Sequence, residues 1–82
     1  MSVRLEGAVI RLEGECRVED AEALLSLLQE DAGRVVDLTA AGGLHTAAIQ
    51  VLLALRPPLA GPAGDPFLAR WLVPLLATTP PG

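Results

Sequence analysis

Aromatic side chains are almost missing from this 82-residue chain, which contains one Phe, one Trp and no Tyr. Recognition of single-stranded nucleic acids relies on stacking bases against aromatic rings, so the composition disfavours that class of ligand. Hydrophobic residues nevertheless make up 51% of the chain. We therefore expect one small domain over residues 1–82, with a core of Leu, Val, Ile and Ala.

Cysteine and histidine are equally scarce, because Cys16 and His45 are the single examples of each. One cysteine cannot form an internal disulfide, which is typical of proteins kept in the reducing cytoplasm. Cys16 is expected to act as a small hydrophobic residue, and a redox role is the alternative. A zinc site needs more such ligands than this chain offers. The sequence therefore predicts no metal and no other cofactor.

Basic residues are few and scattered, with six against ten acidic residues and a formal net charge of −4. Because phosphate contacts dominate nucleic-acid affinity, binding to DNA, RNA or an anionic membrane surface is disfavoured. The longest apolar run, residues 47–55, is interrupted by Gln50 and is too short to cross a bilayer. The first residues lack the apolar segment of a signal peptide. We expect a soluble cytoplasmic protein with no nucleic-acid partner and no membrane insertion.

The N-terminal part of the chain predicts two strands followed by a helix. Residues 3–6 and 8–13 alternate apolar and polar side chains, which is the pattern of half-buried strands. Gly7 between them favours a tight antiparallel hairpin, and one longer bent strand is the alternative. Residues 19–31 place Ala21, Leu24, Leu25 and Leu28 at helical spacing and have Gly33 just past their end, so they predict a helix.

The middle of the chain predicts a strand, a loop and a second helix. Residues 34–39 indicate a buried strand because two β-branched valines lie between glycine-containing segments. A loop of small residues over 40–44 leads to a helix that begins at His45 or Thr46 and ends at Arg56, before two prolines. This helix is apolar almost all round, so it needs cover on more than one side.

The last part of the chain is rich in proline and glycine. Residues 57–64 indicate a rigid surface connection, and the presence of a fourth strand there stays open. Asp65 and Pro66 are typical of a helix start, and Pro74 is expected to kink or shorten that helix. Residues 78–82 are expected to form a flexible tail. The element order predicts an α/β fold, with helices packed on a small mixed β-sheet whose third strand is parallel to its neighbour.

Several short segments together carry a family resemblance. They are VIRLEGE at 9–15, the helix with Ala21 and Leu24, RVVDLT at 34–39, the loop before Thr46, and the leucine pair 52–53. They resemble a STAS domain, the fold of bacterial anti-sigma-factor antagonists and of sulfate-transporter tails, here shortened in its C-terminal part. The resemblance implies that Thr46 occupies the position at which a partner kinase, itself the anti-sigma factor, phosphorylates a serine. His45 stands where the family has Asp, and Ala48 where it has Gly.

Thr46 is the first candidate site residue. Phosphorylation would add negative charge at a helix start and so switch a docking surface, whereas the alternative is that Thr46 serves only as the N-cap. His45 is expected to lie in the loop or cap the helix, and Asp37 is expected to order the loop after its strand through backbone amides. Contacts with a partner are expected from the loop and the helix start, namely from Gly42, Gly43, Leu44, His45, Thr46 and Ile49.

A C-terminal apolar stripe is the second candidate surface, formed by Phe67, Leu68, Trp71, Leu72 and Leu75. This stripe either closes the core or docks on a second copy to give a homo-oligomer. The sequence supplies no catalytic set that can be assembled, so the expected function is a non-enzymatic regulatory or adaptor protein. Its partner would be an anti-sigma factor, a kinase or another signalling protein. The alternative is a structural or oligomerisation subunit of a larger complex, such as a lipid-transport accessory subunit.

Overall fold

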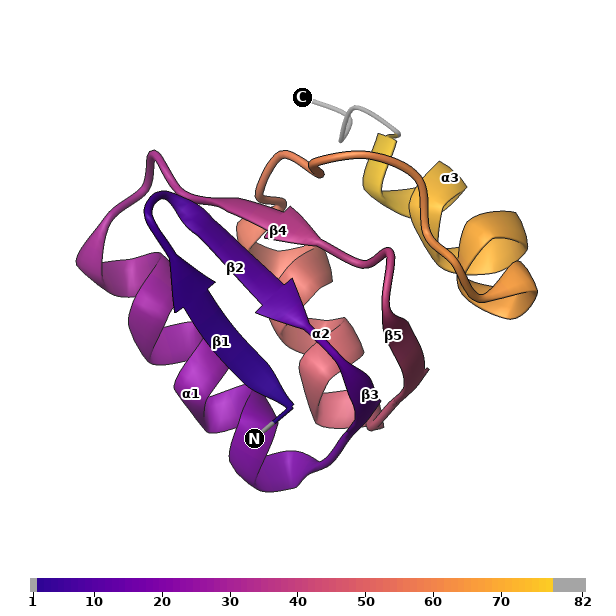
Figure 1. Ribbon diagram of the computed structural model, residues 1–82, viewed down its shortest axis with the longest axis horizontal. Helices are drawn as coiled ribbons and strands as arrows, with labels where there is room; N and C mark the ends of the chain where they lie inside the picture. The colour runs from indigo at the N-terminus through magenta and orange to yellow at the C-terminus, as the bar shows by residue number, and fades with distance from the viewer. Residues whose placement is uncertain (1, 78–82) are drawn as a thin grey trace.

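A computed structural model describes residues 2–77, and the tail predicted for residues 78–82 lies outside that range. The chain folds into a layer of short strands covered on one face by helices (Figure 1). This arrangement confirms the predicted small mixed α/β fold. The elements in chain order are β1 (Val3–Glu6), β2 (Val9–Leu12), β3 (Gly14–Cys16), α1 (Val18–Glu30), β4 (Val35–Asp37), β5 (Ala41–Leu44), α2 (Thr46–Leu55), the π-helical turn η1 (Leu68–Leu72) and α3 (Val73–Ala77).

Three strands form the main sheet in the order β1-β2-β4. β1 and β2 are antiparallel and pair Val3 with Leu12, while β2 and β4 are parallel and pair Ile10 with Val36. Gly7 has a φ of 59°, a left-handed conformation that glycine adopts without steric cost, so it makes the turn between β1 and β2. The predicted hairpin and the parallel third strand are both confirmed.

A second, two-stranded sheet joins β3 to β5 in parallel. The prediction of a loop over residues 40–44 is therefore wrong for Ala41–Leu44, which is a strand. Gly14, with a φ of 67°, lets the chain bend between β2 and β3. Its amide donates to the Ala40 carbonyl at 2.9 Å, which brings β5 alongside β3. The strand forms because β3 offers it hydrogen-bonding partners, although Ala and Gly have low strand propensity.

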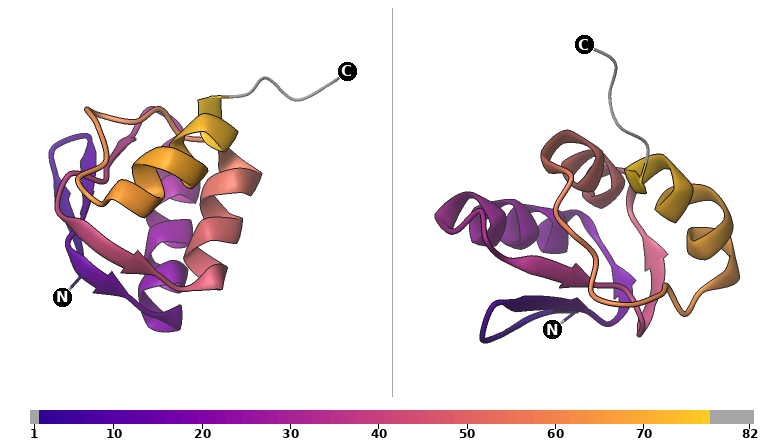
Figure 2. Two further views of the ribbon diagram at one scale, coloured as in Figure 1. Left: turned by 90° about the vertical axis from the view of Figure 1, so that its right-hand side faces the viewer. Right: turned by 90° about the horizontal axis from the view of Figure 1, so that it is seen from above.

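Helices α1 and α2 lie side by side against the same face of the sheet, and the segment η1–α3 lies beyond α2 (Figure 2). Ala21, Leu24 and Leu28 of α1 are buried, as their spacing predicted. The outer face of the hairpin is polar, and Arg4 and Arg11 form ion pairs with Glu6 at 3.3 and 2.7 Å. The charges on the outer face of the hairpin are therefore paired with one another.

The C-terminal segment completes the core after a proline-rich connection. In the described residues, the possible fourth strand is reduced to one bridge between Leu59 and Val36. Asp65 caps the next helix, because its Oδ1 accepts hydrogen bonds from the amides of Phe67 and Leu68 at 2.8 and 3.1 Å. The predicted irregularity before Pro74 takes the form of the wide turn η1, after which the helix continues to Ala77. The largest fully buried side chains are Ile10, Leu12, Leu24, Val36, Leu38 and Leu52.

Candidate functional site

Two hydrogen bonds of His45 fix the start of α2, one made by its backbone amide and one by its imidazole. Its amide donates to the Cys16 carbonyl at 2.8 Å, which ends the pairing of β3 with β5. Its Nδ1 accepts a hydrogen bond from the Ala47 amide at 3.0 Å, so the imidazole caps the helix. The interpretation of Thr46 as the N-cap is therefore wrong, because the helix already begins at Thr46 and His45 takes the cap position.

Thr46 is exposed at the first position of a ten-residue helix. The first turn of a helix has backbone amides without intrahelical partners and a positive electrostatic potential. α2 has no acidic residue in its first turn to offset that potential. Thr46 is thus an exposed residue at a place that favours negative charge.

Three of the four residues that precede Thr46 in the chain are exposed. Gly42, Gly43 and His45 are exposed, and an ideal Cβ on Gly43 would meet only the Glu15 side chain at 3.6 Å. Leu44 and Ile49 were predicted as partner contacts as well, but both are partly buried and pack against the core. We use the name β5–α2 surface for Gly42, Gly43, His45 and Thr46.

Asp37 lies at the end of β4, where it holds the next residues in place. Its Oδ1 accepts a hydrogen bond from the Thr39 amide at 2.8 Å. Hydrogen bonds from Thr39, with a smaller contribution from Arg11, lower the pKa of Asp37 from its ordinary value of 3.8. Thr39 in turn donates from its hydroxyl to the Pro62 carbonyl at 3.3 Å. Asp37 therefore orders the connection between β4 and β5.

The predicted C-terminal stripe is divided between core and surface. Leu68 and Leu72 are 2% and 4% exposed and belong to the core, so their assignment to an oligomer face is wrong. Phe67, Trp71 and Leu75 are 63%, 57% and 54% exposed. All five residues are apolar, so the sequence alone does not distinguish them. The packing of η1 on the core buries two of them and leaves the other three exposed to solvent.

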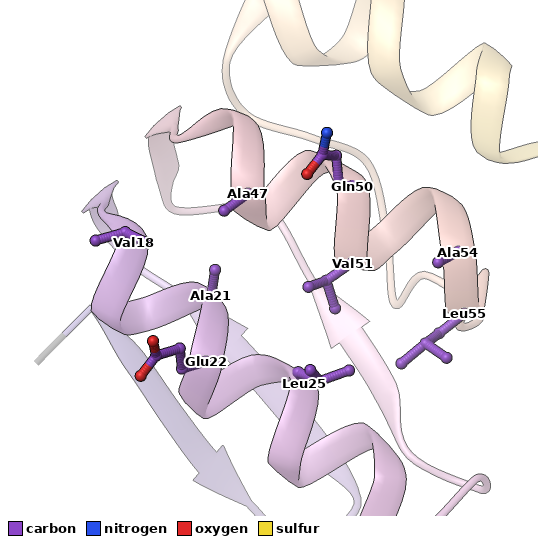
Figure 3. Close-up of a pocket in the computed structure, with 9 residues that line it drawn as sticks. All are labelled: Val18, Ala21, Glu22, Leu25, Ala47, Gln50, Val51, Ala54 and Leu55. Carbon is purple, nitrogen blue, oxygen red and sulfur yellow. The ribbon is translucent and has the colours of Figure 1, made fainter.

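An open groove between α1 and α2 is a feature that the sequence interpretation missed (Figure 3). Its volume is about 440 Å³. The signal was present, since α2 is apolar almost all round and only one of its sides can face the sheet. The lining residues are Val18, Ala21, Glu22, Leu25, Ala47, Gln50, Val51, Ala54 and Leu55.

The reactive side chains are engaged in structural roles. Cys16 is buried in the core, and burial, with a smaller contribution from Asp20, raises the pKa of its thiol to about 11. A thiol with so high a pKa stays protonated near neutral pH and is a poor nucleophile. Over residues 2–77, no three His, Cys, Asp or Glu residues are grouped as metal ligands. In the same range no helix combines the length and apolar character needed to traverse a bilayer.

No protein-family model, curated protein or solved structure matches this chain. The resemblance to STAS domains therefore rests on short segments of sequence and on the order of the elements.

Proposed function

We propose that this chain is a cytoplasmic, non-enzymatic regulatory or adaptor domain of the STAS type. It binds a signalling protein, such as an anti-sigma factor or kinase, through the β5–α2 surface. The observation that carries this proposal is the exposure of Thr46 at the start of α2, with Gly42 and Gly43 exposed on the strand that leads to it. None of the pockets described for residues 2–77 is lined by the four residues of the β5–α2 surface, so this surface suits protein contact better than the enclosure of a substrate.

The order of elements supports this family assignment. A β1–β2 hairpin, helix α1, the parallel strand β4 and then α2 follow one another as the resemblance implies. Ala48 replaces the glycine of the family, and its side chain is 1% exposed and packed inside the fold. The substitution therefore leaves the exposed side of α2 unchanged. His45 replaces the acidic residue and supplies the helix cap through its imidazole.

Phosphorylation of Thr46 is the proposed switch. A phosphate carries about −1.5 to −2 charges near neutral pH. The dipole of the first helical turn, which has no acidic residue, stabilises that charge on the folded domain. The same charge repels an acidic partner surface, and it would lose its hydration against an apolar one, so modification releases the partner.

A structural or oligomerisation subunit is the second candidate function. The observation in its favour is the exposure of Phe67, Trp71 and Leu75, each more than half accessible. Apolar side chains that gather on the surface of a small domain are typical of protein contacts. A lipid-transport accessory subunit would use such a surface in a permanent complex.

The test of the main proposal is incubation of the purified chain with ATP and a lysate of its source cells, followed by intact-mass spectrometry. We expect the wild type to gain one phosphate and Thr46→Ala to gain none. Ser26→Ala is the matched control, because Ser26 is also an exposed hydroxyl-bearing residue on a helix. The absence of a phosphate on the wild type, together with full activity of Thr46→Ala in cells, would contradict the switch.

A further inference from the structure

Two apolar surfaces remain open on the helical layer, and they differ in shape. One is the groove between α1 and α2, and the other is a ridge formed by Phe67, Trp71 and Leu75. We propose that the ridge of one copy seats in the groove of a second copy, so that the chain self-associates. This contact is separate from the β5–α2 surface and goes beyond the regulatory role proposed above.

The groove is shaped to receive large side chains. Small residues from both helices, Ala21, Ala47 and Ala54, leave space between α1 and α2 (Figure 3). The apolar walls are incompletely covered, since Val18 and Leu55 are 44% and 42% exposed. A volume of about 440 Å³ is comparable to that of sites that hold a drug-sized ligand.

The three residues of the ridge lie along one side of the last helical segment. Phe67, Trp71 and Leu75 follow one another at intervals of four residues, which places them near one side of the segment 66–77. Two aromatic rings on the surface are notable in a chain that has no others. Aromatic side chains that fill a pocket are the usual anchors of protein interfaces.

The charges beside the two surfaces are complementary. Every charged residue of α1 is acidic, including Glu19 and Glu22, and α2 carries no charge. The single charged residue in the segment 66–77 is Arg70, whose guanidinium lies 5.4 Å from the centre of the Trp71 ring. Arg70 is therefore opposite in charge to Glu22 in the groove wall, and we expect the two to approach each other when the ridge seats in the groove. A contact of two grooves would bring acidic groups together, and a contact of two ridges would bring two arginines together.

The ridge cannot occupy the groove of its own chain. In Figure 1 and in the right-hand view of Figure 2, α2 lies between α1 and the segment η1–α3. Leu68 and Leu72 also anchor that segment in the core. The occupant of the groove is therefore the ridge of a second copy.

The lone tryptophan makes this proposal directly measurable, because Trp71 lies on the ridge. We expect its fluorescence emission to shift to the blue as protein concentration rises, over the same range in which light scattering reports a growing mass. Unchanged emission and a monomer mass at every concentration would overturn the proposal.

Variants of each surface distinguish this contact from the other possible ones. Leu75→Asp blocks the ridge and Ala54→Lys blocks the groove, both at exposed positions where folding is checked by circular dichroism. Each variant alone should weaken self-association about tenfold or more. An equimolar mixture should regain association, since one partner keeps the ridge and the other keeps the groove. If only one of the two variants weakens association, or if the mixture regains none, the contact pairs like surfaces and the proposal is wrong.

A charge exchange tests the predicted pair. Glu22→Arg and Arg70→Glu should each weaken association, and the double variant should restore it towards the wild type. An additive loss in the double variant would contradict the predicted approach of Arg70 to Glu22.

Discussion

At the scale of single residues, His45 determines where α2 begins. Removal of its side chain in His45→Ala leaves the Ala47 amide without its acceptor. We expect the free energy of unfolding to fall by about 0.5–2 kcal/mol, measured by urea denaturation. His45→Asn keeps a capping acceptor and should recover most of the loss. If Asn recovers nothing, packing of the imidazole ring, and not the cap, stabilises the helix start.

Asp37 gives a second residue-scale prediction, which concerns pH. Its folded-state pKa is lowered below the ordinary value of 3.8, chiefly by hydrogen bonds from Thr39. The ionised carboxylate therefore stabilises the fold above that value, and this stabilisation is lost as pH falls through the lowered pKa. Asp37→Asn keeps an oxygen acceptor for the Thr39 amide but loses the charge. The variant should be less stable than the wild type at neutral pH, and the difference should vanish in acid.

Denaturation by urea at a series of pH values measures this effect. A difference between Asp37→Asn and the wild type that stays constant into strong acid would contradict it. Such a result would mean that the charge of Asp37 makes no contribution to stability.

The sequence left the start of α2 open between His45 and Thr46, and the reason lies in local preferences. Threonine is a better N-cap than histidine in general, so local preference favours Thr46 as the cap. The hydrogen bond from the His45 amide to Cys16 keeps His45 outside the helix and makes it the cap. That contact joins residues far apart in the chain, and no local pattern reports it.

At the scale of elements, Gly64 fixes the connection between α2 and the last helical segment. Its amide donates to the Leu38 carbonyl at 3.4 Å, and a Cβ at this position would overlap the Thr39 carbonyl oxygen. Gly64→Ala must therefore displace backbone, and we expect a loss of about 1–3 kcal/mol in the free energy of unfolding. Gly43→Ala is the matched control, because its new methyl group meets only a side chain at ordinary contact distance. Equal effects of the two substitutions in urea denaturation would contradict this packing.

Helices and strands whose own residues show a clear pattern were predicted correctly. The two strands that form only by pairing with each other were not. The hairpin, α1 and β4 show clear periodicity or β-branched residues, and all three are present. β3 and β5 are short and contain Gly14, Gly42 and Gly43, which have no strand preference of their own. Each becomes a strand only because the other lies beside it, so a loop was predicted where β5 forms.

At the scale of the whole molecule, a small aliphatic core carries the stability. Leu52 is fully buried on α2, whereas Leu55 on the same helix is 42% exposed. We expect Leu52→Ala to lower the free energy of unfolding by about 2–5 kcal/mol, a large share of what a small domain has. Leu55→Ala, measured by the same urea titration, should cost much less. Similar losses for both would contradict the placement of α2 on the sheet.

The division of the surface into a charged sheet face and a helical layer with apolar patches follows from the same fold. Arg4, Glu6 and Arg11 pair with one another or with Glu13 on the outer side of the hairpin, so that face has its charges satisfied. The β5–α2 surface presents the exposed Thr46, and the groove and the ridge present apolar side chains. Binding is therefore expected on the helical side and at the start of α2, and not on the outer face of β1 and β2.

Site-specific photo-crosslinking in the source cells tests this central claim most directly. A photoreactive residue is placed at Gly43 on the β5–α2 surface or at Arg11 on the outer face of the sheet, where both positions are exposed. We predict one discrete crosslinked protein from position 43, lost when Thr46→Asp is introduced, and none from position 11. Identical crosslinks from the two positions, or a crosslink at position 43 that Thr46→Asp leaves unchanged, would contradict the account.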